Sequence, residues 1–273
     1  VISLVGESSV AHEAATTYID GGANASDSLD GSISVTTNSE VDVNKVGTYT
    51  VTYSAVDTAG NKADEITRKV IVSDSTKPII TLIGEGTVSH EAATEYVDKG
   101  ATAKDSLDGD LTVVTAGSVD VSKIGSYTIT YNVTDSAGNA AAEVQRVVTV
   151  GDTSIPVITL LGEATLVHEA KSNYSDAGAT ALDTLDGNIT DSIVTVSTVD
   201  INKVGEYSVS YNVVDTNGNN AATVKRVVVV KDSIIPIIVL NGENAVTHEA
   251  ATNYNDLGAT ASDTLDGNIS TSI

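Results

Sequence analysis

The chain has 273 residues, of which 37 are acidic and 14 basic, so its formal net charge at pH 7 is −23. This charge repels polyphosphate and argues against nucleic acid as a partner. The chain contains no Cys, Met, Trp or Phe. The absence of Cys excludes disulfides and cysteine-ligated metal sites. A core must then consist of Val, Ile, Leu, Ala and Tyr, which suits small β-domains with thin interiors. No apolar run approaches the roughly 20 residues of a membrane span, so we expect no membrane insertion of this segment.

The sequence repeats itself. His-Glu-Ala begins at His12, His90, His168 and His248, which are 78, 78 and 80 residues apart, and Asp-Gly pairs at 30, 108, 186 and 266 keep the same spacing. We therefore expect four tandem units, 1–77, 78–155, 156–235 and 236–273, of which the last stops about halfway, as in an excerpt from a longer array. The fourth position after each histidine is Thr or Ser, so the zinc signature His-Glu-x-x-His is absent.

The second unit illustrates the predicted elements in chain order. Residues 78–96 are predicted to form two short strands and a turn. Two further strands follow, separated by an acidic loop, and a turn-rich connection then leads to a hairpin. The predicted strands are 78–85, 86–90, 97–105, 111–117, 126–135 and 141–150, with turns or loops at 91–96, 105–110, 119–125 and 135–139.

The stretch 126–135 alternates strictly, with Tyr127, Ile129 and Tyr131 on one face and threonines and Asn132 on the other. This period is typical of a strand with one buried face. The fold class predicted is all-β, with tandem immunoglobulin-like antiparallel β-sandwiches of about seven strands each. Tyr127 stands where such folds place a tyrosine corner. Arg146 falls in phase with the buried positions of the last strand, for which a bulge or an edge position are the two explanations.

The pattern P-x-I-T-L-x-G-E, then Y-x-D-x-G-A, L-D-G-x-I and V-x-D-x-x-G-N recurs through the units. It resembles the bacterial immunoglobulin-like repeat named after a pesticidal crystal protein and, more distantly, the hyalin repeat. The resemblance covers essentially the whole chain. It implies a β-sandwich in a long secreted or surface-anchored bacterial protein, including adhesins, where such modules usually act as spacers. It implies no catalytic residue.

Acidic residues recur at three places that an immunoglobulin-like sandwich brings to one end: the incoming linker and two loops. For the second unit these residues are Asp74, Asp105, Asp108 and Asp135, and the turn of the preceding unit adds Glu13. Clustered carboxylates raise one another's pKa, and a hard cation that takes about 6–8 oxygen ligands resolves the repulsion. The sequence therefore predicts calcium at each junction, similar in logic to cadherin junctions.

The other junctions follow the same pattern. The second junction would use Glu91, Asp152, Asp183, Asp186 and Asp215, and the third would use Glu169, Asp232, Asp263 and Asp266. The first unit has the corresponding loop residues Asp27, Asp30 and Asp57, but the linker that would complete their site is not in the sequence. Two alternatives stay open, because Asp-Gly and Asp-x-x-Gly-Asn are also ordinary turn sequences and because a site could lie within one domain without the upstream Glu. The histidines stand beside the turn and are expected to hydrogen-bond or pack at the domain joint, with metal ligation as the alternative.

These features favour a non-catalytic extracellular spacer, a rod stiffened by calcium whose partners are the neighbouring repeats of the same chain. A glycan- or protein-binding module and a self-assembling filament or sheath of identical chains are the alternatives. The sequence contains no Ser-His-Asp spacing, nucleotide loop or zinc motif, so an enzyme is not predicted.

Overall fold

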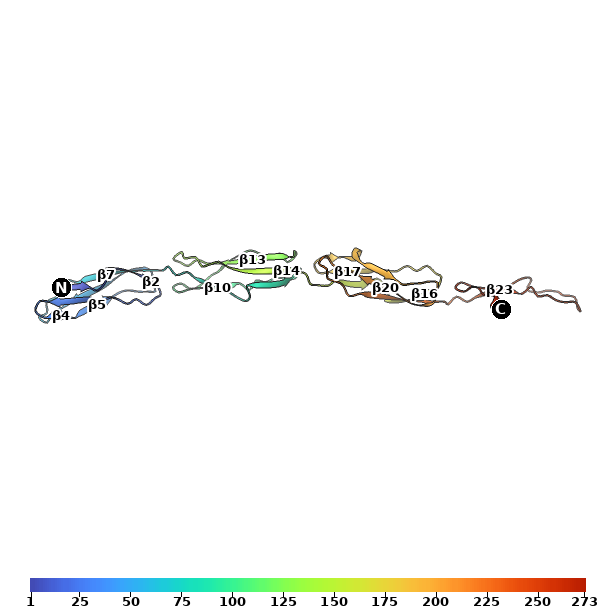
Figure 1. Cartoon of the computed structure of the whole chain (residues 1–273), viewed down its shortest axis with the longest axis horizontal. Coiled ribbons are helices and arrows are strands. Elements are labelled where there is room, and N and C mark those ends of the chain that lie inside the picture. The colour runs from blue at the N-terminus through green and yellow to red at the C-terminus, as the bar shows by residue number, and fades with distance from the viewer. The chain divides into compact units, whose positions relative to one another are not determined.

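The computed structural model describes residues 1–273. The chain divides into two compact units, residues 1–90 with 94–150 and residues 91–93 with 151–273. It contains 24 strands, two short 3₁₀ turns and no α-helix (Figure 1). No helix therefore has the length and hydropathy that crossing a bilayer requires.

Each full repeat contains seven strands, in agreement with the expected number of about seven. In the second unit the stretch 111–117, predicted as one strand, is divided between two strands, which belong to different sheets. In repeat 1 they are β1 (Ile2–Leu4), β2 (Ser9–Glu13), β3 (Ala23–Asp27), β4 (Gly31–Ile33), β5 (Val35–Ser39), β6 (Gly47–Ala55) and β7 (Ile66–Ser73). In repeat 2 they are β8 (Ile79–Leu82), β9 (Thr87–Glu91), β10 (Ala101–Asp105), β11 (Gly109–Leu111), β12 (Val114–Ala116), β13 (Gly125–Asn132) and β14 (Val144–Gly151).

Repeat 3 has β15 (Val157–Leu160), β16 (Thr165–Glu169), β17 (Ala179–Asp183), β18 (Gly187–Asn188), β19 (Val194–Ser197), β20 (Gly205–Asn212) and β21 (Val224–Lys231), with the 3₁₀ turn η1 (Thr190–Ser192) before β19. The remaining residues form β22 (Ile237–Leu240), β23 (Ala259–Asp263), β24 (Gly267–Asn268) and η2 (Ser270–Ser272).

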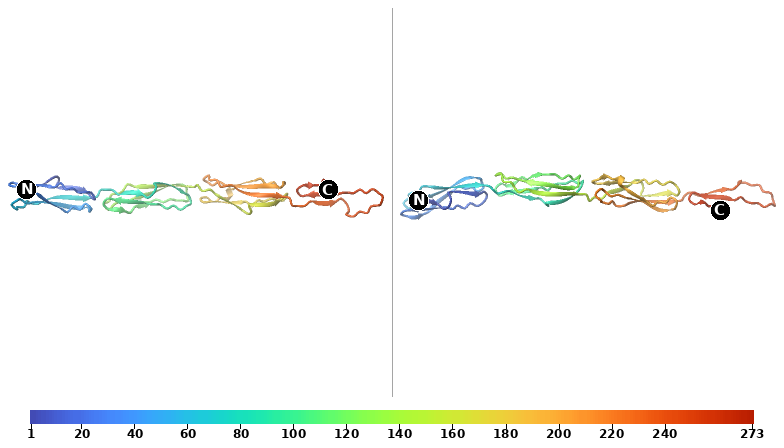
Figure 2. Two further views of the ribbon diagram at one scale, coloured as in Figure 1. Left: turned by 90° about the horizontal axis from the view of Figure 1, so that it is seen from below. Right: turned by 45° about the horizontal axis from the view of Figure 1, so that its top comes forward.

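The strands of each full repeat form two sheets, which Figure 2 shows as two layers. In repeat 1 the sheets have the orders β1-β3-β4 and β2-β7-β6-β5, and repeats 2 and 3 have the same arrangement. The sandwich is confirmed, and one strand pair in it is parallel: β2 runs parallel to β7, as β16 does to β21. The reason is that the first strand changes sheet at Gly6, whose φ is +88°, and then lies beside the last strand, which has the same direction.

The alternation in the sequence does place one face of each hairpin in the core. Ile129, Tyr131 and Val133 are buried, together with Val148 and Val150 of β14, the strand that pairs with β13 in the same sheet. The tyrosine corner is also confirmed, because the Tyr127 hydroxyl donates a hydrogen bond to the Lys123 carbonyl at 2.9 Å. Tyr49 and Tyr207 make the same contact in repeats 1 and 3.

Three arginines are the largest buried side chains: Arg68, Arg146 and Arg226 are at most 1% exposed. Arg146 stands opposite Ile129 in an uninterrupted antiparallel register, and β14 lies between β13 and β9. Both explanations offered by the sequence, a bulge and an edge position, are therefore wrong. The guanidinium lies in the core itself.

A polar network satisfies each buried arginine. The Arg146 guanidinium forms an ion pair with Asp98 and donates hydrogen bonds to the Tyr131 hydroxyl at 3.0 Å and to the carbonyls of Glu85 at 3.0 Å and Ile83 at 2.6 Å. Desolvation opposes ionisation of Asp98, but hydrogen bonds from Tyr131 and Arg146 outweigh it and lower the pKa of that carboxyl. Desolvation and the Asp98 carboxylate raise the pKa of Tyr131 to about 12. A buried charge is tolerated here because every donor has an acceptor.

Candidate metal centre

Three carboxyl groups gather at the linker end of repeat 2. Asp74 follows β7, Asp105 is the last residue of β10, and Asp135 lies in the turn after β13. One oxygen from each lies within 4.8 Å of the other two. Asp105 is 3% exposed and Asp135 7%, so two of the three carboxyls are almost removed from water.

Local hydrogen bonds position the two loop aspartates. Asp105 Oδ1 accepts the backbone N–H groups of Leu107 at 2.8 Å and Asp108 at 3.1 Å. Asp108 then accepts the backbone N–H of Ser136 at 2.6 Å and its hydroxyl at 2.8 Å. Asp108 therefore ties the β10–β11 loop to the β13–β14 loop and brings Asp105 close to Asp135.

Asn139 links the linker to this loop pair. Its side-chain amide donates to Asp135 Oδ2 at 2.9 Å and to the Asp74 carbonyl at 3.3 Å. Sequence reasoning missed this role, although Asn139 and its equivalent Asn219 recur as the last residue of the Asp-x-x-Gly-Asn turn.

Two oxygens of the group lack a donor. Asp74 Oδ2 and Asp105 Oδ2 are buried and have no hydrogen-bond partner, whereas buried polar atoms are normally satisfied. Desolvation, together with the neighbouring Asp105 and Asp135 carboxylates, raises the pKa of Asp74. For Asp135, desolvation is outweighed by hydrogen bonds from Asn139, and the pKa of its carboxyl is lowered. An all-oxygen group of this kind suits a hard divalent cation.

The group does not include Glu13 or Asp108. Glu13 instead accepts the Ser75 N–H at 2.8 Å, the Ser75 hydroxyl at 2.6 Å and the Thr76 hydroxyl at 2.7 Å. These hydrogen bonds, the largest from the Ser75 and Thr76 side chains, lower the pKa of Glu13 to about 2. Glu13 thus holds the two linker residues that follow Asp74.

Repeat 3 has the same arrangement. Asp152, Asp183 and Asp215 form the group, and Asp183 Oδ2 is buried without a partner. Asp186 ties the loops together through the N–H and hydroxyl of Thr216, both at 2.8 Å. Glu91 accepts the N–H of Thr153 at 2.9 Å and its hydroxyl at 2.6 Å, and so holds the linker as Glu13 does.

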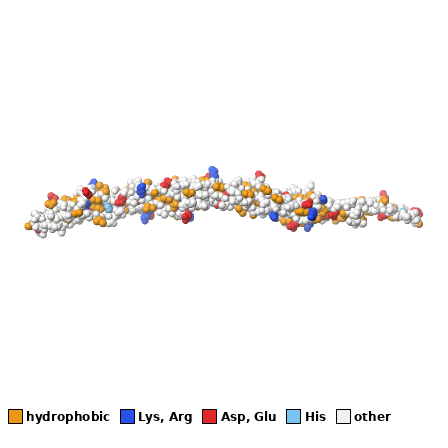
Figure 3. All heavy atoms as spheres, viewed as in Figure 1, with side chains coloured by type: hydrophobic (Ala, Val, Ile, Leu, Met, Phe, Trp, Pro, Cys, Tyr) orange, Lys and Arg blue, Asp and Glu red, His pale blue; other side chains and the backbone are white.

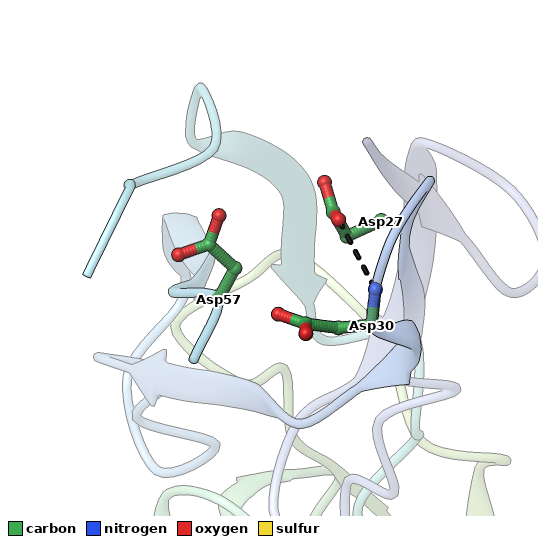
Figure 4. Close-up of side chains that lie close together, drawn as sticks. All are labelled: Asp27, Asp30 and Asp57. Carbon is green, nitrogen blue, oxygen red and sulfur yellow. Dashed lines mark hydrogen bonds between the residues drawn. The ribbon is translucent and has the colours of Figure 1, made fainter. Parts of the chain in front are cut away.

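Two further groups are more open. Asp27, Asp30 and Asp57 approach one another in repeat 1, where the backbone N–H of Asp30 donates to Asp27 (Figure 4). Asp232, Asp263 and Asp266 approach one another in the partial fourth repeat, whose linker is held through Ser233 by Glu169. Neither group has a buried carboxyl oxygen without a partner. Elsewhere acidic side chains lie scattered over the face that Figure 3 shows.

The His-Glu-Ala motif builds the turn that presents the glutamate. Ala15, Ala93, Lys171 and Ala251 have φ between 53° and 64°, a left-handed conformation that costs non-glycine residues about 1 kcal/mol or more. His12 Nε2 lies 3.1 Å from the Thr16 carbonyl, and the Thr16 hydroxyl donates to the Glu13 carbonyl at 2.7 Å. The His12 ring also packs edge-on against Tyr18 at 5.1 Å. The histidines lie beside the turn as predicted, but their partners are Thr or Ser and Tyr residues of the same repeat rather than groups at the domain joint, and none belongs to an acidic group.

One apolar contact accompanies the site. Leu107, between Asp105 and Asp108, packs against the core of repeat 1, and Leu265 packs against the core of repeat 3. The equivalent Leu29 is 90% exposed. Sequence reasoning missed this contact, for which the signal is a leucine that recurs inside an acidic loop.

Two-layer sandwiches repeated along one chain define a tandem immunoglobulin-like protein. The chain belongs to the family of bacterial surface protein Ig-like domains, whose sequence model matches residues 2–72, 80–150 and 158–230. The resemblance drawn from the sequence is therefore confirmed.

Three relatives agree with this assignment. Internalin I of Listeria monocytogenes is 33% identical over 198 residues, which are 68% of this chain and 11% of that protein. Pesticidal crystal protein Cry22Aa of Bacillus thuringiensis is 30% identical over 256 residues, 90% of this chain and 34% of that protein. Hyalin of Strongylocentrotus purpuratus is 34% identical over 131 residues, 45% of this chain and 11% of that protein. The chain thus spans from about a tenth to a third of the length of these relatives.

Proposed function

We propose that this chain is a non-catalytic spacer segment of a secreted or surface-anchored bacterial protein, in which calcium at the linker ends of repeats 2 and 3 stiffens the array and supports adhesion. Family membership and the tandem repeats support the spacer role. The neighbouring repeats are the partners, so stability depends mainly on each repeat and on its junctions.

One observation carries the calcium proposal. Asp105 Oδ2 and Asp183 Oδ2 are buried without a hydrogen-bond donor, and each belongs to a group of three carboxylates. Without a cation, both the desolvation and the mutual repulsion of these groups oppose folding. A calcium ion, with water or carbonyl oxygens completing its about 6–8 ligands, removes both penalties.

Binding of this kind would restrict the linker. In repeat 2 the ion would join Asp74 of the linker to Asp105 and Asp135 of the two loops, while Glu13 holds Ser75 and Thr76 from the other side. The linker would then be fixed at two successive points. Stiffening follows because a linker held in this way has few backbone conformations left.

The test compares the full chain in calcium and in chelator by small-angle scattering and thermal unfolding. We expect calcium to raise the thermal midpoint, because binding at 100 times the dissociation constant adds about 2.7 kcal/mol per site to the free energy of unfolding. We also expect calcium to lengthen the maximum dimension. The variant Asp105→Asn/Asp183→Asn should lose most of both responses. The control Asp64→Asn/Asp110→Asn removes two acids that are exposed and belong to none of the groups, and should keep them.

An unchanged midpoint and dimension on adding calcium would remove the calcium part of the proposal. An equal loss of response in both variants would instead point to nonspecific screening of the net charge. The filament and ligand-binding alternatives stay predictions, testable by concentration-dependent polymerisation and by glycan-array binding.

A further inference from the structure

The two buried acidic groups differ at one oxygen. In repeat 2, Asp74 Oδ2 has no hydrogen-bond partner. In repeat 3 the equivalent Asp152 Oδ2 accepts a hydrogen bond from the side-chain amide of Asn217 at 2.7 Å. The position of Asn217 in the Asp-x-x-Gly-Asn turn is occupied by Ala137 in repeat 2, whose methyl group can donate nothing.

We infer that Asn217 substitutes for the cation at Asp152, so that the site of repeat 3 binds calcium more weakly than the site of repeat 2. This inference rests on the proposed function. An ion at the repeat 3 site must displace the amide from the oxygen it would ligate, whereas an ion at the repeat 2 site meets a bare oxygen. A hydrogen bond to a carboxylate is among the stronger ones in proteins, so its loss lowers the affinity.

The remaining features of the two sites are closely matched. Asp105 and Asp183 are both buried with Oδ2 free. Asn139 and Asn219 make equivalent bonds to the linker carbonyl, each at 3.3 Å. Asp152 differs also at Oδ1, which accepts the Ser154 hydroxyl at 2.7 Å, but that oxygen is not the one that Asn217 contacts. By analogy with the unpartnered Asp74 Oδ2, we take Asp152 Oδ2 as the ligating oxygen, and the turn residue is the feature that differs at this atom.

The consequence is a graded response within one chain. As calcium rises, the linker end of repeat 2 would order first. The linker end of repeat 3, already tethered by the Asn217 amide, would need calcium less and respond to it at higher concentration. The third residue of the turn thus acts as a tuning position for each repeat.

The test is calcium titration of the full chain by isothermal calorimetry in two backgrounds. Asp183→Asn leaves the repeat 2 site and Asp105→Asn leaves the repeat 3 site, while the double variant supplies the heat of all other groups for subtraction. We expect the repeat 2 site to bind about tenfold more tightly, a difference of about 1.4 kcal/mol. Both turn positions are exposed, so exchanging them should leave the fold intact, which far-ultraviolet circular dichroism checks.

The reciprocal exchange decides the cause. Asn217→Ala in the Asp105→Asn background should raise the affinity of the repeat 3 site about tenfold, and Ala137→Asn in the Asp183→Asn background should lower that of the repeat 2 site equally. An unchanged or weakened repeat 3 site in Asn217→Ala would overturn the inference, because the amide would then be irrelevant or would ligate through its oxygen. The absence of specific heat in every background would instead end the proposed calcium function, and this inference with it.

Discussion

Replacing Arg146 by Met should leave repeat 2 marginally stable or unfolded, while repeats 1 and 3 stay folded. The substitution keeps an unbranched apolar chain, shorter than that of arginine, and removes the charged guanidinium. It breaks the ion pair with Asp98 and the hydrogen bonds to Tyr131 and to the Glu85 and Ile83 carbonyls. Asp98 then keeps its charge in a largely buried place, because its side chain is only 22% exposed.

The expected cost is large relative to the stability of one repeat. Removing one partner of a buried ion pair costs about 3–5 kcal/mol. A domain of about 78 residues has a free energy of unfolding of about 4–12 kcal/mol at ordinary stability per residue. The variant repeat should therefore be marginal or unfolded at 25 °C. Repeats 1 and 3 keep their own networks around Arg68 and Arg226.

Hydrogen exchange resolved by peptide is the assay, because it reports each repeat separately. We expect lost protection within 78–150 and native protection within 1–72. Gln145→Met is the matched control, since Gln145 is the exposed neighbour on the same strand and its replacement should change the stability by no more than about 0.5 kcal/mol. Adding Asp98→Asn to Arg146→Met should restore part of the stability, because it neutralises the stranded carboxylate.

A loss below about 1 kcal/mol in Arg146→Met would refute this reasoning. It would mean that the buried pair contributes no more than a well-packed methionine, as some buried ion pairs do. A double variant no more stable than the single one would show that lost packing, rather than the stranded charge, causes the effect.

Three further predictions concern the corner, the junction contact and the titration of the site. Tyr127→Phe removes the bond to the Lys123 carbonyl and should cost repeat 2 about 0.5–1.5 kcal/mol in urea unfolding; no change would show that water replaces the hydroxyl. Leu107→Ala should cost about 1–3 kcal/mol, whereas Leu29→Ala, at a site 90% exposed, should be neutral; equal effects would contradict the packing of Leu107 on repeat 1. In chelator, the raised pKa of Asp74 means that the folded state binds this proton more tightly than the unfolded chain, so stability should rise as pH falls toward that pKa from above. Thermal midpoints measured against pH should show this gain in the wild type but not in Asp74→Asn, and calcium should abolish it. The lowered pKa of Glu13 removes stability only at lower pH, as pH falls from 4.5 toward about 2. Identical pH profiles for the wild type and Asp74→Asn would contradict this prediction.

The periodic features of the sequence predicted most of the fold. The 78- and 80-residue spacings gave the repeats, and the alternation around Ile129 and Tyr131 identified the buried face of the hairpin. The tyrosine corner followed from Tyr127 at the start of its strand. These predictions succeed because strand periodicity and turn chemistry are local properties that depend on residues close together in the sequence.

Which side chains meet is a different matter, because partners distant in sequence are brought together only by the packed sheets. Arg146 and Asp98 are 48 residues apart; the phase of the strand places Arg146 on the buried face, but nothing local shows that a carboxylate meets it there. The loop aspartates Asp105 and Asp135 could be assigned to one end of the sandwich from the order of its strands. Side-chain geometry, which only the tertiary structure decides, determines two other features. Glu13 accepts a hydrogen bond from the linker backbone instead of joining these aspartates, and Asn217 donates a hydrogen bond to Asp152.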